Sequence, residues 1–415
     1  MRRCVLVCLG AAVALALGTA PDANLFPPFV WASEPPTGCP FPKSQTVTGI
    51  EFTGLWARYT DADTWYLSWA ADGTLYSSFT DGVVEGLRSD SNGPKANTGF
   101  ATIVGDNPLG LRIADKGIYP SSPLPYGGRY PSANLFYKGV WYYGTYCLMD
   151  SDGDPGKGLN WDILGPFVGI RLSYDKGKTW IDTPHTPEHP LFPEPKKPGG
   201  KVKFGAPHFV DFGREMEHSP DGKAYLVGHG AQDPDPAPRE ANASWITGDQ
   251  VFLARVEADP KRVNDRKSWE FFAGYDRSGR PLWSHSFRAV KPLIDWNNHC
   301  GNVSITYDAP LGKYLMAVTD GGNTISAFNT FILESDQVTG PYRLVTYMKS
   351  FGEQGYFVNF PSKFIGPDGR TLWMCYAANF SNGVKEWPHH KANPPGSGYG
   401  MVLQQVRLLG AGVSK

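Results

Sequence analysis

Beyond its first 20 residues, the 415-residue sequence lacks an apolar run long enough to cross a membrane. A transmembrane helix needs roughly 20 consecutive apolar residues, and the run from Cys4 to Leu17 is shorter than that. This run follows the basic start Met1-Arg2-Arg3 and leads into the small residues Gly18-Thr19-Ala20. That order is typical of a secretory signal peptide. We therefore expect residues 1–20 to be a signal peptide and the protein to be secreted or periplasmic, without membrane insertion.

The sequence also lacks an excess of basic residues. Its formal net charge is −1, and its 39 Lys and Arg residues are scattered among 40 Asp and Glu residues. A protein that binds nucleic acid usually carries a basic stripe that follows the phosphate backbone. We expect no nucleic-acid partner.

Cysteine is scarce. Without the predicted signal peptide, Cys39, Cys147, Cys300 and Cys375 remain, and none belongs to a C-x-x-C pair. This argues against a zinc cluster and against a thioredoxin-type redox site. Four cysteines allow three pairings in an oxidising compartment, so structural disulfides and buried free thiols both stay open.

Long helical periodicity is absent, whereas turn-forming and aromatic residues are abundant. The chain has 48 Gly, 36 Pro and 13% aromatic residues, which is typical of an all-β protein with many turns. After a Pro-rich lead-in predicted for residues 21–49, a strand, a tight turn and an aromatic-rich strand recur five times. The copies begin at residues 63, 131, 206, 301 and 360, and the fifth begins with the expected strand Phe360 to Ile365.

A hairpin that recurs through the whole chain is typical of β-propeller blades. Asp-Gly and Lys-Gly dipeptides supply the positive backbone angles that tight hairpins need. A pair of β-sandwiches would not explain such a repeat. The sequence therefore predicts an all-β protein, a five-bladed β-propeller that forms a single domain over residues 50–410.

One local motif supports a propeller independently. The segment Ser173 to Trp180 reads S-x-D-x-G-x-T-W, the "Asp box" found in sialidases and other propellers. We expect the Asp175 carboxylate to bind turn amides and Trp180 to pack between blades, which is a structural role. A sialidase is disfavoured because this box stands alone and no Arg-Ile-Pro signature lies near the start.

Propeller geometry sorts the acidic residues of the first repeat. The innermost strand of a blade starts at the functional face and the second strand returns there, so Asp63 and Asp81 are predicted to lie on one rim. Asp72-Gly73 then falls in the tight turn at the opposite end. Glycosidic cleavage requires two carboxyl groups, one as acid and one as base or nucleophile. We expect Asp63 and Asp81 to be catalytic.

Other polar and aromatic residues share the predicted rim. Aromatic faces suit the C–H face of a sugar, and Asp, Asn, His and Arg suit its hydroxyls. The residues predicted to bind substrate are Trp65, Arg129, Asp150, His208, His229, His299, Asn302, Asp320, Tyr356 and Asn359. The same sorting adds Tyr126, Asn134, Trp296 and Asn379.

The segment Asp150-Ser-Asp152-Gly-Asp154 resembles the opening of a calcium loop. Pro155 stands where an EF-hand has glycine, and no Glu closes the loop. We expect a solvated loop here, with no metal and no cofactor in the protein; calcium is the alternative.

The first repeat resembles a known family. The segments Asp63-Thr-Trp, Trp69-Ala-Ala-Asp72-Gly73-Thr-Leu-Tyr76 and Phe79-Thr-Asp81-Gly82 are similar to the opening signature of a group of secreted bacterial propellers. This group, formerly a domain of unknown function, includes the endo-D-arabinanases, which are glycoside hydrolases of mycobacterial arabinan. The resemblance covers residues 50–410, although its distinctive motif is confined to the first repeat. It implies a five-bladed propeller with paired acids, Asp63 and Asp81, at its mouth.

The predicted function is a monomeric, secreted glycoside hydrolase that cleaves a polysaccharide or oligosaccharide, arabinan or a related glycan. Two alternatives stay open. A polysaccharide lyase would act on a uronate-containing glycan with a His or Tyr base, for which His208, His229, His299 and Tyr356 are the candidates. A non-catalytic carbohydrate-binding propeller would keep the aromatic residues and need neither acid.

Overall fold

The computed structural model describes residues 25–150, 161–237 and 243–410, and the strands in this part of the chain form five sheets. The first sheet contains β3 (Asp61–Asp63), β4 (Ser68–Trp69), β5 (Leu75–Val84), β6 (Leu87–Ser89), β7 (Asn97–Val104) and β8 (Arg112–Pro120). The second contains β9 (Gly128–Tyr137), β10 (Val140–Met149) and β11 (Ile163–Ser173). The third contains β12 (Gly205–Phe209), β13 (Ala224–Gly230), β14 (Gln250–Val256), β15 (Glu270–Tyr275), β16 (Pro281–Ser284) and β17 (Ile294–Asp295).

The fourth sheet contains β18 (Val303–Asp308), β19 (Lys313–Asp320), β20 (Asn329–Ser335) and β21 (Arg343–Met348). The fifth contains β22 (Tyr356–Asn359), β23 (Thr371–Ala377), β24 (Met401–Gly410), β2 (Val47–Tyr59) and β1 (Phe29–Val30). The helices of the described residues are short 3-10 turns: η1 (Arg214–Met216), η2 (Arg266–Ser268), η3 (Phe287–Ala289), η4 (Ser362–Phe364) and η5 (Phe380–Gly383).

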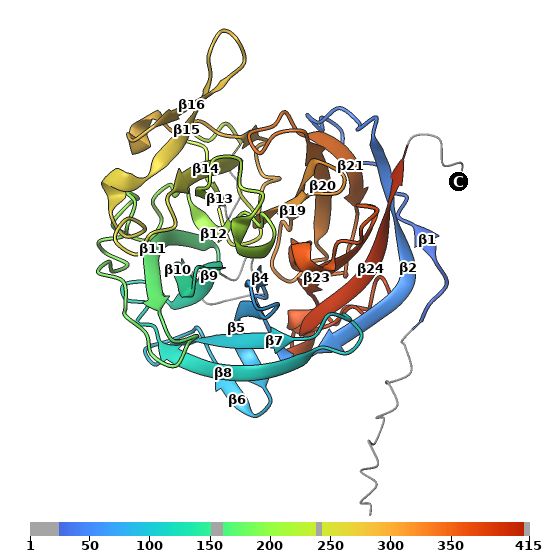
Figure 1. Cartoon of the computed structure of the whole chain (residues 1–415), viewed down its shortest axis with the longest axis horizontal. Coiled ribbons are helices and arrows are strands. Elements are labelled where there is room, and N and C mark those ends of the chain that lie inside the picture. The colour runs from blue at the N-terminus through green and yellow to red at the C-terminus, as the bar shows by residue number, and fades with distance from the viewer. Residues whose placement is uncertain (1–24, 151–160, 238–242, 411–415) are drawn as a thin grey trace, which may run out of the picture.

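The sheets stand around a common centre. Figure 1 looks along the shortest axis of the molecule and shows β4, β9, β12 and β23 close to this centre, with β8, β16 and β1 at the periphery. Neighbouring strands within each sheet are antiparallel. This arrangement is a β-propeller, so the predicted all-β, single-domain fold class is confirmed at that level.

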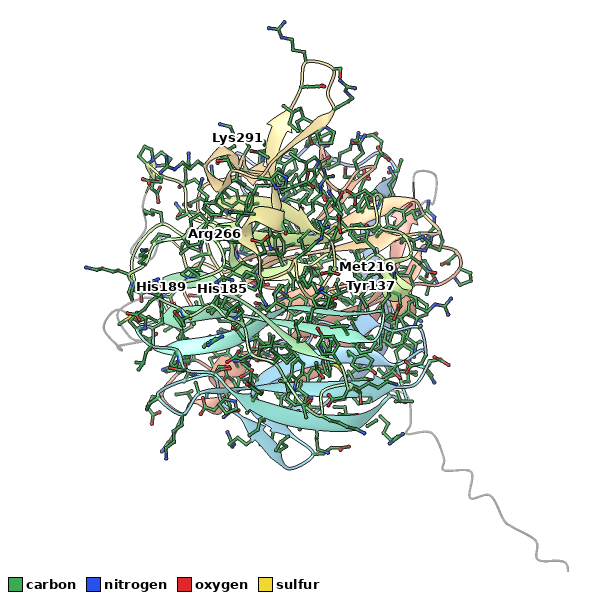
Figure 2. All side chains as sticks on the ribbon, turned by 60° about the vertical axis from the view of Figure 1, so that its left-hand side comes forward. Tyr137, His185, His189, Met216, Arg266 and Lys291 are labelled. Atoms are coloured by element: carbon green, nitrogen blue, oxygen red, sulfur yellow. The ribbon has the colours of Figure 1, made fainter. Side chains whose placement is uncertain are left out.

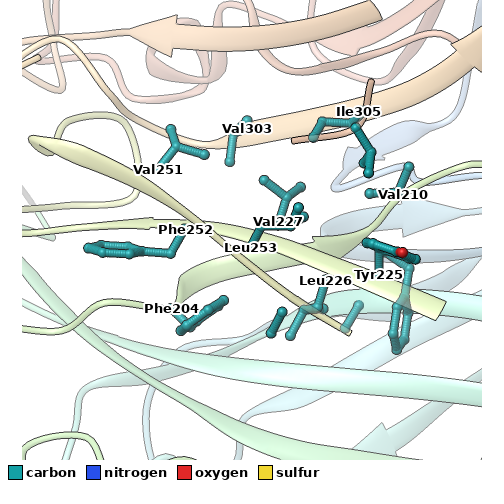
Figure 3. Packing of buried hydrophobic residues seen from close by; sticks show 14 of the residues in the cluster. Phe204, Val210, Tyr225, Leu226, Val227, Val251, Phe252, Leu253, Val303 and Ile305 are labelled. Atoms are coloured by element: carbon teal, nitrogen blue, oxygen red, sulfur yellow. The ribbon is translucent and has the colours of Figure 1, made fainter. Parts of the chain in front are cut away.

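Because each sheet is packed between two neighbours, its central strands are buried on both faces. All seven residues of β13 are buried, although successive side chains of a strand point to opposite faces. Figure 3 shows Leu226 and Val227 of β13 within one apolar cluster that also holds Phe252 of β14 and Ile305 of β18. Burial on both faces explains why these strands read as continuous apolar runs rather than as an alternating pattern.

Four of the five predicted repeats coincide with the first hairpin of a sheet. The copy at residue 63 contains the turn Asp72-Gly73, where the Gly73 N–H donates to the Ala70 carbonyl, so the prediction that Asp72 is a turn residue is confirmed. The predicted first strand of the fifth copy, Phe360 to Ile365, is wrong. The strand is β22, and residues 362–364 form η4, because Pro361 has no N–H to donate to a ladder.

The Asp box has the predicted structural role. The Asp175 carboxylate accepts hydrogen bonds from the Thr179 N–H at 2.8 Å and from the Thr179 hydroxyl at 2.6 Å. The Trp180 ring packs against Phe100 of β7 and Trp141 of β10, at centroid distances of 5.0 and 5.3 Å. It therefore lies between the first and second sheets.

The two ends of the described chain meet in the fifth sheet. β2 pairs antiparallel with β24 from Val47 opposite Gly410 to Tyr59 opposite Met401. β1 pairs with β2, and Trp31, which follows β1, packs against Phe351 at 5.7 Å. The segment predicted as a lead-in thus contributes residues to this sheet and its core.

Buried side-chain amides join neighbouring sheets near the centre. Asn134 of β9 donates to the carbonyls of Tyr66 and Tyr76 at 2.7 and 2.8 Å and accepts from Trp141 Nε1 at 2.6 Å. Asn359 of β22 donates to the carbonyl of Trp65 at 2.9 Å. These bonds connect the second and fifth sheets to the first.

Hydrogen bonds also hold two loops together at the outside of the molecule. Arg266 donates to the carbonyl of Leu191 at 2.7 Å, and a ring nitrogen of His185 lies 2.9 Å from the carbonyl of Asn264. Figure 2 labels His185, His189 and Arg266, which lie on one side of the molecule. The long connection between β11 and β12 is therefore held against the segment that precedes β15.

Cys39, Cys147, Cys300 and Cys375 are all free thiols, so the structure contains no disulfide among these four and the buried-thiol alternative holds for Cys147, Cys300 and Cys375. No helix of the described residues is long and apolar enough to span a bilayer. The predicted signal peptide and most of the calcium-like segment fall on residues 1–24 and 151–160, which lie outside the described residues.

Replacing Asn134 with Ala tests the importance of the buried amide. The change leaves the Trp141 indole N–H and two carbonyls without their partner, and each unsatisfied buried group costs roughly 1–3 kcal/mol. We expect the free energy of unfolding to fall by about 3 kcal/mol, measured by urea denaturation. The control is Asn107→Ala, because Asn107 is exposed and bonds only its own turn at Leu109. Equal losses in the two variants would contradict this role.

Candidate active site

A cavity of about 940 Å³ opens beside the inner strands of the first, second and fifth sheets. Asp63, Thr64 and Asp81 of the first sheet line it, together with Tyr130 and Tyr146 of the second. The long connection from β23 to β24 contributes Phe380, Asn382, His390 and Tyr399. A volume of this size is typical of a small-molecule or oligosaccharide site.

Asp63 ends β3 and is buried, with 8% of its surface exposed. Its Oδ2 accepts a hydrogen bond from the Tyr356 hydroxyl at 2.8 Å, and its Oδ1 accepts one from the Thr64 hydroxyl at 2.9 Å. Both carboxylate oxygens therefore have donors, and their orientation in the cavity is fixed.

Asp81 lies at an irregularity within β5. Asp61 pairs with Val83 and Asp63 with Thr80, so β5 carries an extra residue between these pairs, and Asp81 has a φ of 51°. Such a bulge redirects a side chain and is common next to active sites. Gly82 follows because a Cβ there would lie 1.8 Å from the Asp61 carbonyl oxygen. The sequence rule expected Asp81 at a strand end, whereas β5 continues to Val84.

One oxygen of the Asp81 carboxylate accepts two hydrogen bonds. Oδ1 accepts from the Ser91 N–H at 2.8 Å and from the Thr80 hydroxyl at 3.2 Å. The Tyr399 hydroxyl donates to the Asp81 backbone carbonyl at 2.5 Å. As a whole residue, Asp81 is half-buried, whereas Asp63 is buried.

Burial raises the pKa values of both carboxyl groups above the ordinary range of an aspartate. Burial, and then the neighbouring charge of Asp81, raise the pKa of Asp63 to about 8 against the opposing hydrogen bonds from Tyr356 and Thr64. Burial raises the pKa of Asp81 to about 6, and the Ser91 N–H limits that rise. At neutral pH, Asp63 is therefore mainly protonated and Asp81 mainly ionised.

The structure brings four of the sequence-predicted residues to this cavity or its wall. Asp63, Asp81 and Asn379 line it, and Tyr356 reaches it through its bond to Asp63. Asp150 lies next to it, because its carboxylate accepts a hydrogen bond from the backbone N–H of Trp161, another lining residue.

Three predicted residues serve the core instead. The Trp65 ring is buried, stacks on Phe79 at 5.6 Å and donates to the Ala62 carbonyl. Asn302 is buried, and its side-chain oxygen accepts from the Phe357 N–H and the Thr319 hydroxyl. Asn359 donates to the carbonyls of Trp65 and Phe357. None of Trp65, Asn302 and Asn359 is among the described residues that line the cavity.

His208 and His229 are buried. The His208 ring stacks on Tyr66 at a centroid distance of 3.3 Å, and burial holds its pKa well below the usual range. A ring nitrogen of His229 lies 2.7 Å from the Ser244 carbonyl, and burial lowers the pKa of His229 to about 4. Both imidazoles are thus neutral at pH 7, and neither lines the cavity among the described residues.

The remaining predicted residues lie elsewhere. His299 pairs with Asp320 at 3.0 Å and lies against the Trp296 ring. Arg129 is buried and donates to the Thr145 hydroxyl at 2.8 Å, and burial lowers its pKa to about 10. In the part of the chain that the structure describes, none of these residues lines the cavity. Sorting residues by their position along the strands of each repeat therefore assigns too many residues to one site.

Sequence reasoning missed several residues that line the cavity: Arg58, Arg88, Tyr146, Trp161, Trp245, Phe380 and Tyr399. The rule considered the start of the first strand and the end of the second strand in each repeat. Arg58, however, lies on β2, and Tyr399 directly precedes β24. The start of the final repeated strand was the signal that could have identified Tyr399.

No three or more His, Cys, Asp or Glu side chains of the described residues form a group that could hold a metal ion. The calcium alternative concerned Asp152 and Asp154, which lie outside those residues. The polar groups of the described lining are carboxyl, phenol, indole, amide, guanidinium, hydroxyl and imidazole groups.

No family model matches the chain, and no curated protein matches it. Among solved structures, it is similar to a family 117 glycoside hydrolase of Zobellia galactanivorans (TM-score 0.46, 10% identity, 89% of this chain and 93% of that chain). It is also similar to the GH43_1 enzyme of Xanthomonas citri (TM-score 0.44, 12% identity, 86% and 90%). An alpha-L-arabinofuranosidase of Podospora anserina has a TM-score of 0.44, 11% identity and coverage of 85% and 92%. At this level of similarity, these structures do not assign an activity to this chain.

The raised pKa of Asp63 predicts a pH-dependent stability. Since its folded pKa of about 8 exceeds the ordinary value of 3.8, the folded protein binds more protons than the unfolded chain between these pH values. The contribution of Asp63 to the free energy of unfolding is fully present below about pH 4 and is lost as the pH rises through about 8. Asn mimics the neutral acid, so Asp63→Asn should gain thermal stability relative to the wild type as the pH rises from 4 to 8.

The measurement is the difference in melting temperature between wild type and Asp63→Asn across that pH range. Asp72→Asn is the matched control on the same sheet. Burial raises the pKa of Asp72, but the Lys176 ammonium and the turn hydrogen bonds together outweigh burial and lower this pKa below its ordinary value. This control should show no gain at high pH. A constant difference between wild type and Asp63→Asn would contradict the assigned pKa shift.

Proposed function

We propose that this protein is a glycoside hydrolase that cleaves a polysaccharide or oligosaccharide with Asp63 and Asp81. The observation that carries the proposal is that two carboxyl groups line one large cavity and have pKa values raised to about 8 and about 6. Pairs of titratable groups with separated pKa values are how active sites assign acid and base roles at one pH.

The protonation state at neutral pH sets the role of each carboxyl group. Asp63 is the general acid that protonates the glycosidic oxygen, because it retains its proton at neutral pH. Asp81 is the ionised partner, either a base that activates water or a nucleophile that attacks the sugar carbon. The Tyr356 hydroxyl fixes the Asp63 carboxyl group, and the Ser91 N–H fixes that of Asp81.

The lyase alternative has less support from the site. Its histidine candidates His208, His229 and His299 do not belong to the described lining of the cavity. Burial raises the pKa of Tyr356, the remaining candidate base, well above its ordinary value. Arg58 and Arg88 could still neutralise a uronate, because both line the cavity. A sugar-binding protein without activity would not need the two acids.

The segment from Asp63 to Gly82 resembles the endo-D-arabinanase signature, so arabinan is the first substrate to examine.

We also propose that each of the five sheets is one blade. In support, the predicted repeats at residues 63, 131, 206, 301 and 360 each fall beside the inner strand of a different sheet.

A panel of purified polysaccharides tests the activity. The panel contains arabinan, other neutral glycans and uronate-containing glycans, and both reducing ends and absorbance near 235 nm are measured. Reducing ends without the unsaturated chromophore indicate hydrolysis, whereas both signals together indicate a lyase.

On the glycan that is cleaved, Asp63→Asn and Asp81→Asn should each lower kcat by about 10²–10⁴-fold, because each removes a group that transfers a proton or attacks the sugar. Glycan affinity should be retained. Asp72→Asn, a change in the distant turn, should keep the wild-type kcat. Unchanged cleavage by Asp63→Asn would remove this residue from the mechanism.

The two pKa values predict a bell-shaped pH profile. Activity should rise as Asp81 ionises near pH 6 and fall as Asp63 loses its proton near pH 8. Tyr356→Phe removes a hydrogen bond that stabilises the Asp63 carboxylate, so the alkaline limb should move to higher pH while the acid limb stays in place. Initial rates across this pH range measure both limbs, and an alkaline limb that stays or moves to lower pH would contradict the assignment of Asp63 as the acid.

A further inference from the structure

Aromatic side chains connect the carboxyl pair to the outer part of the cavity. The Tyr356 ring, whose hydroxyl bonds Asp63, contacts Trp245 at a centroid distance of 5.0 Å. Trp245 contacts Phe380 at 5.6 Å, and Phe380 contacts Trp161 at 6.4 Å. These rings meet at interplanar angles of 68–86°, an edge-to-face arrangement that favours contact through ring edges.

Trp161 stands at the outer end of this series. It is half-buried and lines the cavity. Trp387, in the connection between β23 and β24, packs edge-on against it at 6.3 Å and an angle of 81°. Contact with Trp387 therefore limits the movement of the Trp161 ring, which forms part of the cavity wall.

The backbone of Trp161 is held in an unusual conformation. Its φ of 54° lies in the left-handed region, which is unfavourable for a residue with a Cβ. Its N–H donates to the Asp150 carboxylate, and its Nε1 donates to the Asn92 side-chain oxygen at 3.3 Å. Strained positions held by surrounding contacts tend to cluster at binding sites, and here the result is a fixed orientation of the indole.

Polar groups accompany the indole on the same wall. The Asn92 oxygen already accepts from Trp161 and from the Tyr130 hydroxyl at 2.5 Å, which leaves its amide N–H groups as donors. The exposed Arg88 lines the same cavity. A flat indole with amide and guanidinium donors nearby matches a sugar ring, which has an apolar C–H face and a rim of hydroxyls.

We propose that Trp161, supported by Phe380 and Trp387, is a stacking platform for a sugar ring of the glycan beyond the residues at the cleaved bond. This inference rests on the proposed function, since it places a second sugar site in the cavity that holds Asp63 and Asp81. The Phe380 ring lies between the Trp161 ring and the Tyr356 ring that bonds Asp63, at centroid distances of 6.4 and 5.7 Å. The platform therefore binds a neighbouring unit of a chain, and longer glycans use it while the shortest do not.

The test measures glycan affinity by isothermal titration calorimetry in an Asp81→Asn background, so that the ligand is not consumed. The ligands are oligosaccharides of increasing length prepared from each polysaccharide of the panel. Adding Trp161→Ala should lower the affinity for the longer oligosaccharides roughly tenfold. The affinity for the shortest oligosaccharide that binds should stay unchanged. Trp161→Phe should restore part of the affinity, because phenylalanine keeps a flat ring.

The matched control is Trp283→Ala. Trp283 is also half-buried, lies on β16 and packs beneath Arg255 at 4.0 Å, outside the described lining of the cavity. It should leave affinity for every length unchanged. If Trp161→Ala does not fold, as judged by thermal melting, Trp161→Leu replaces it, because leucine keeps apolar volume without a ring.

Equal affinities with and without the Trp161 ring at every length would overturn the platform and leave the proposed function intact. Cleavage by Asp81→Asn at the wild-type rate would overturn the proposed mechanism, while the length dependence of binding would still decide the platform. A wild-type protein that neither cleaves nor binds any glycan of the panel would overturn both.

Discussion

The rest of this structure depends on the pairing of β2 with β24. This antiparallel ladder joins the two ends of the described chain within one sheet and leaves the ring of sheets without a free gap. Because β3 follows β2 directly, closure also determines where Asp63 lies. The Tyr399 hydroxyl, two residues before β24, thereby reaches the backbone carbonyl of Asp81, and the Tyr356 hydroxyl reaches the Asp63 carboxylate.

The same closure accounts for the electrostatics of the site. Packing of the fifth sheet against the first buries Asp63, and burial is the largest cause of its raised pKa. A hydrogen bond from Tyr356 opposes that rise without cancelling it. An acid that keeps its proton at neutral pH therefore follows from how two distant parts of the chain pack, and neither part would produce it alone.

Near the centre of the molecule, polar side chains divide between structure and site according to what surrounds them. Asn134 and Asn359 use their amides to join neighbouring sheets, and His208 lies stacked on Tyr66. These residues occupy inner strands, as Asp63 does, and a rule based on position along a strand cannot separate them. Burial separates the two roles. A buried amide must satisfy its hydrogen bonds within the protein, whereas a group on the cavity wall can bind a ligand.

Strand propensity, tight turns and the repeated hairpin are local properties, so the sequence by itself determined the all-β propeller, the Asp72-Gly73 turn and the structural role of Asp175 and Trp180. It also indicated the pair Asp63 and Asp81, through their spacing around one hairpin. Only the tertiary structure decided that Tyr399 and Trp161 line the same cavity as that pair and that the Tyr356 hydroxyl bonds Asp63. It also decided that His208 and His229 do not line the described cavity and that β22 precedes Phe360. Contacts between sheets and the burial they create depend on residues hundreds of positions apart, and no local pattern encodes them.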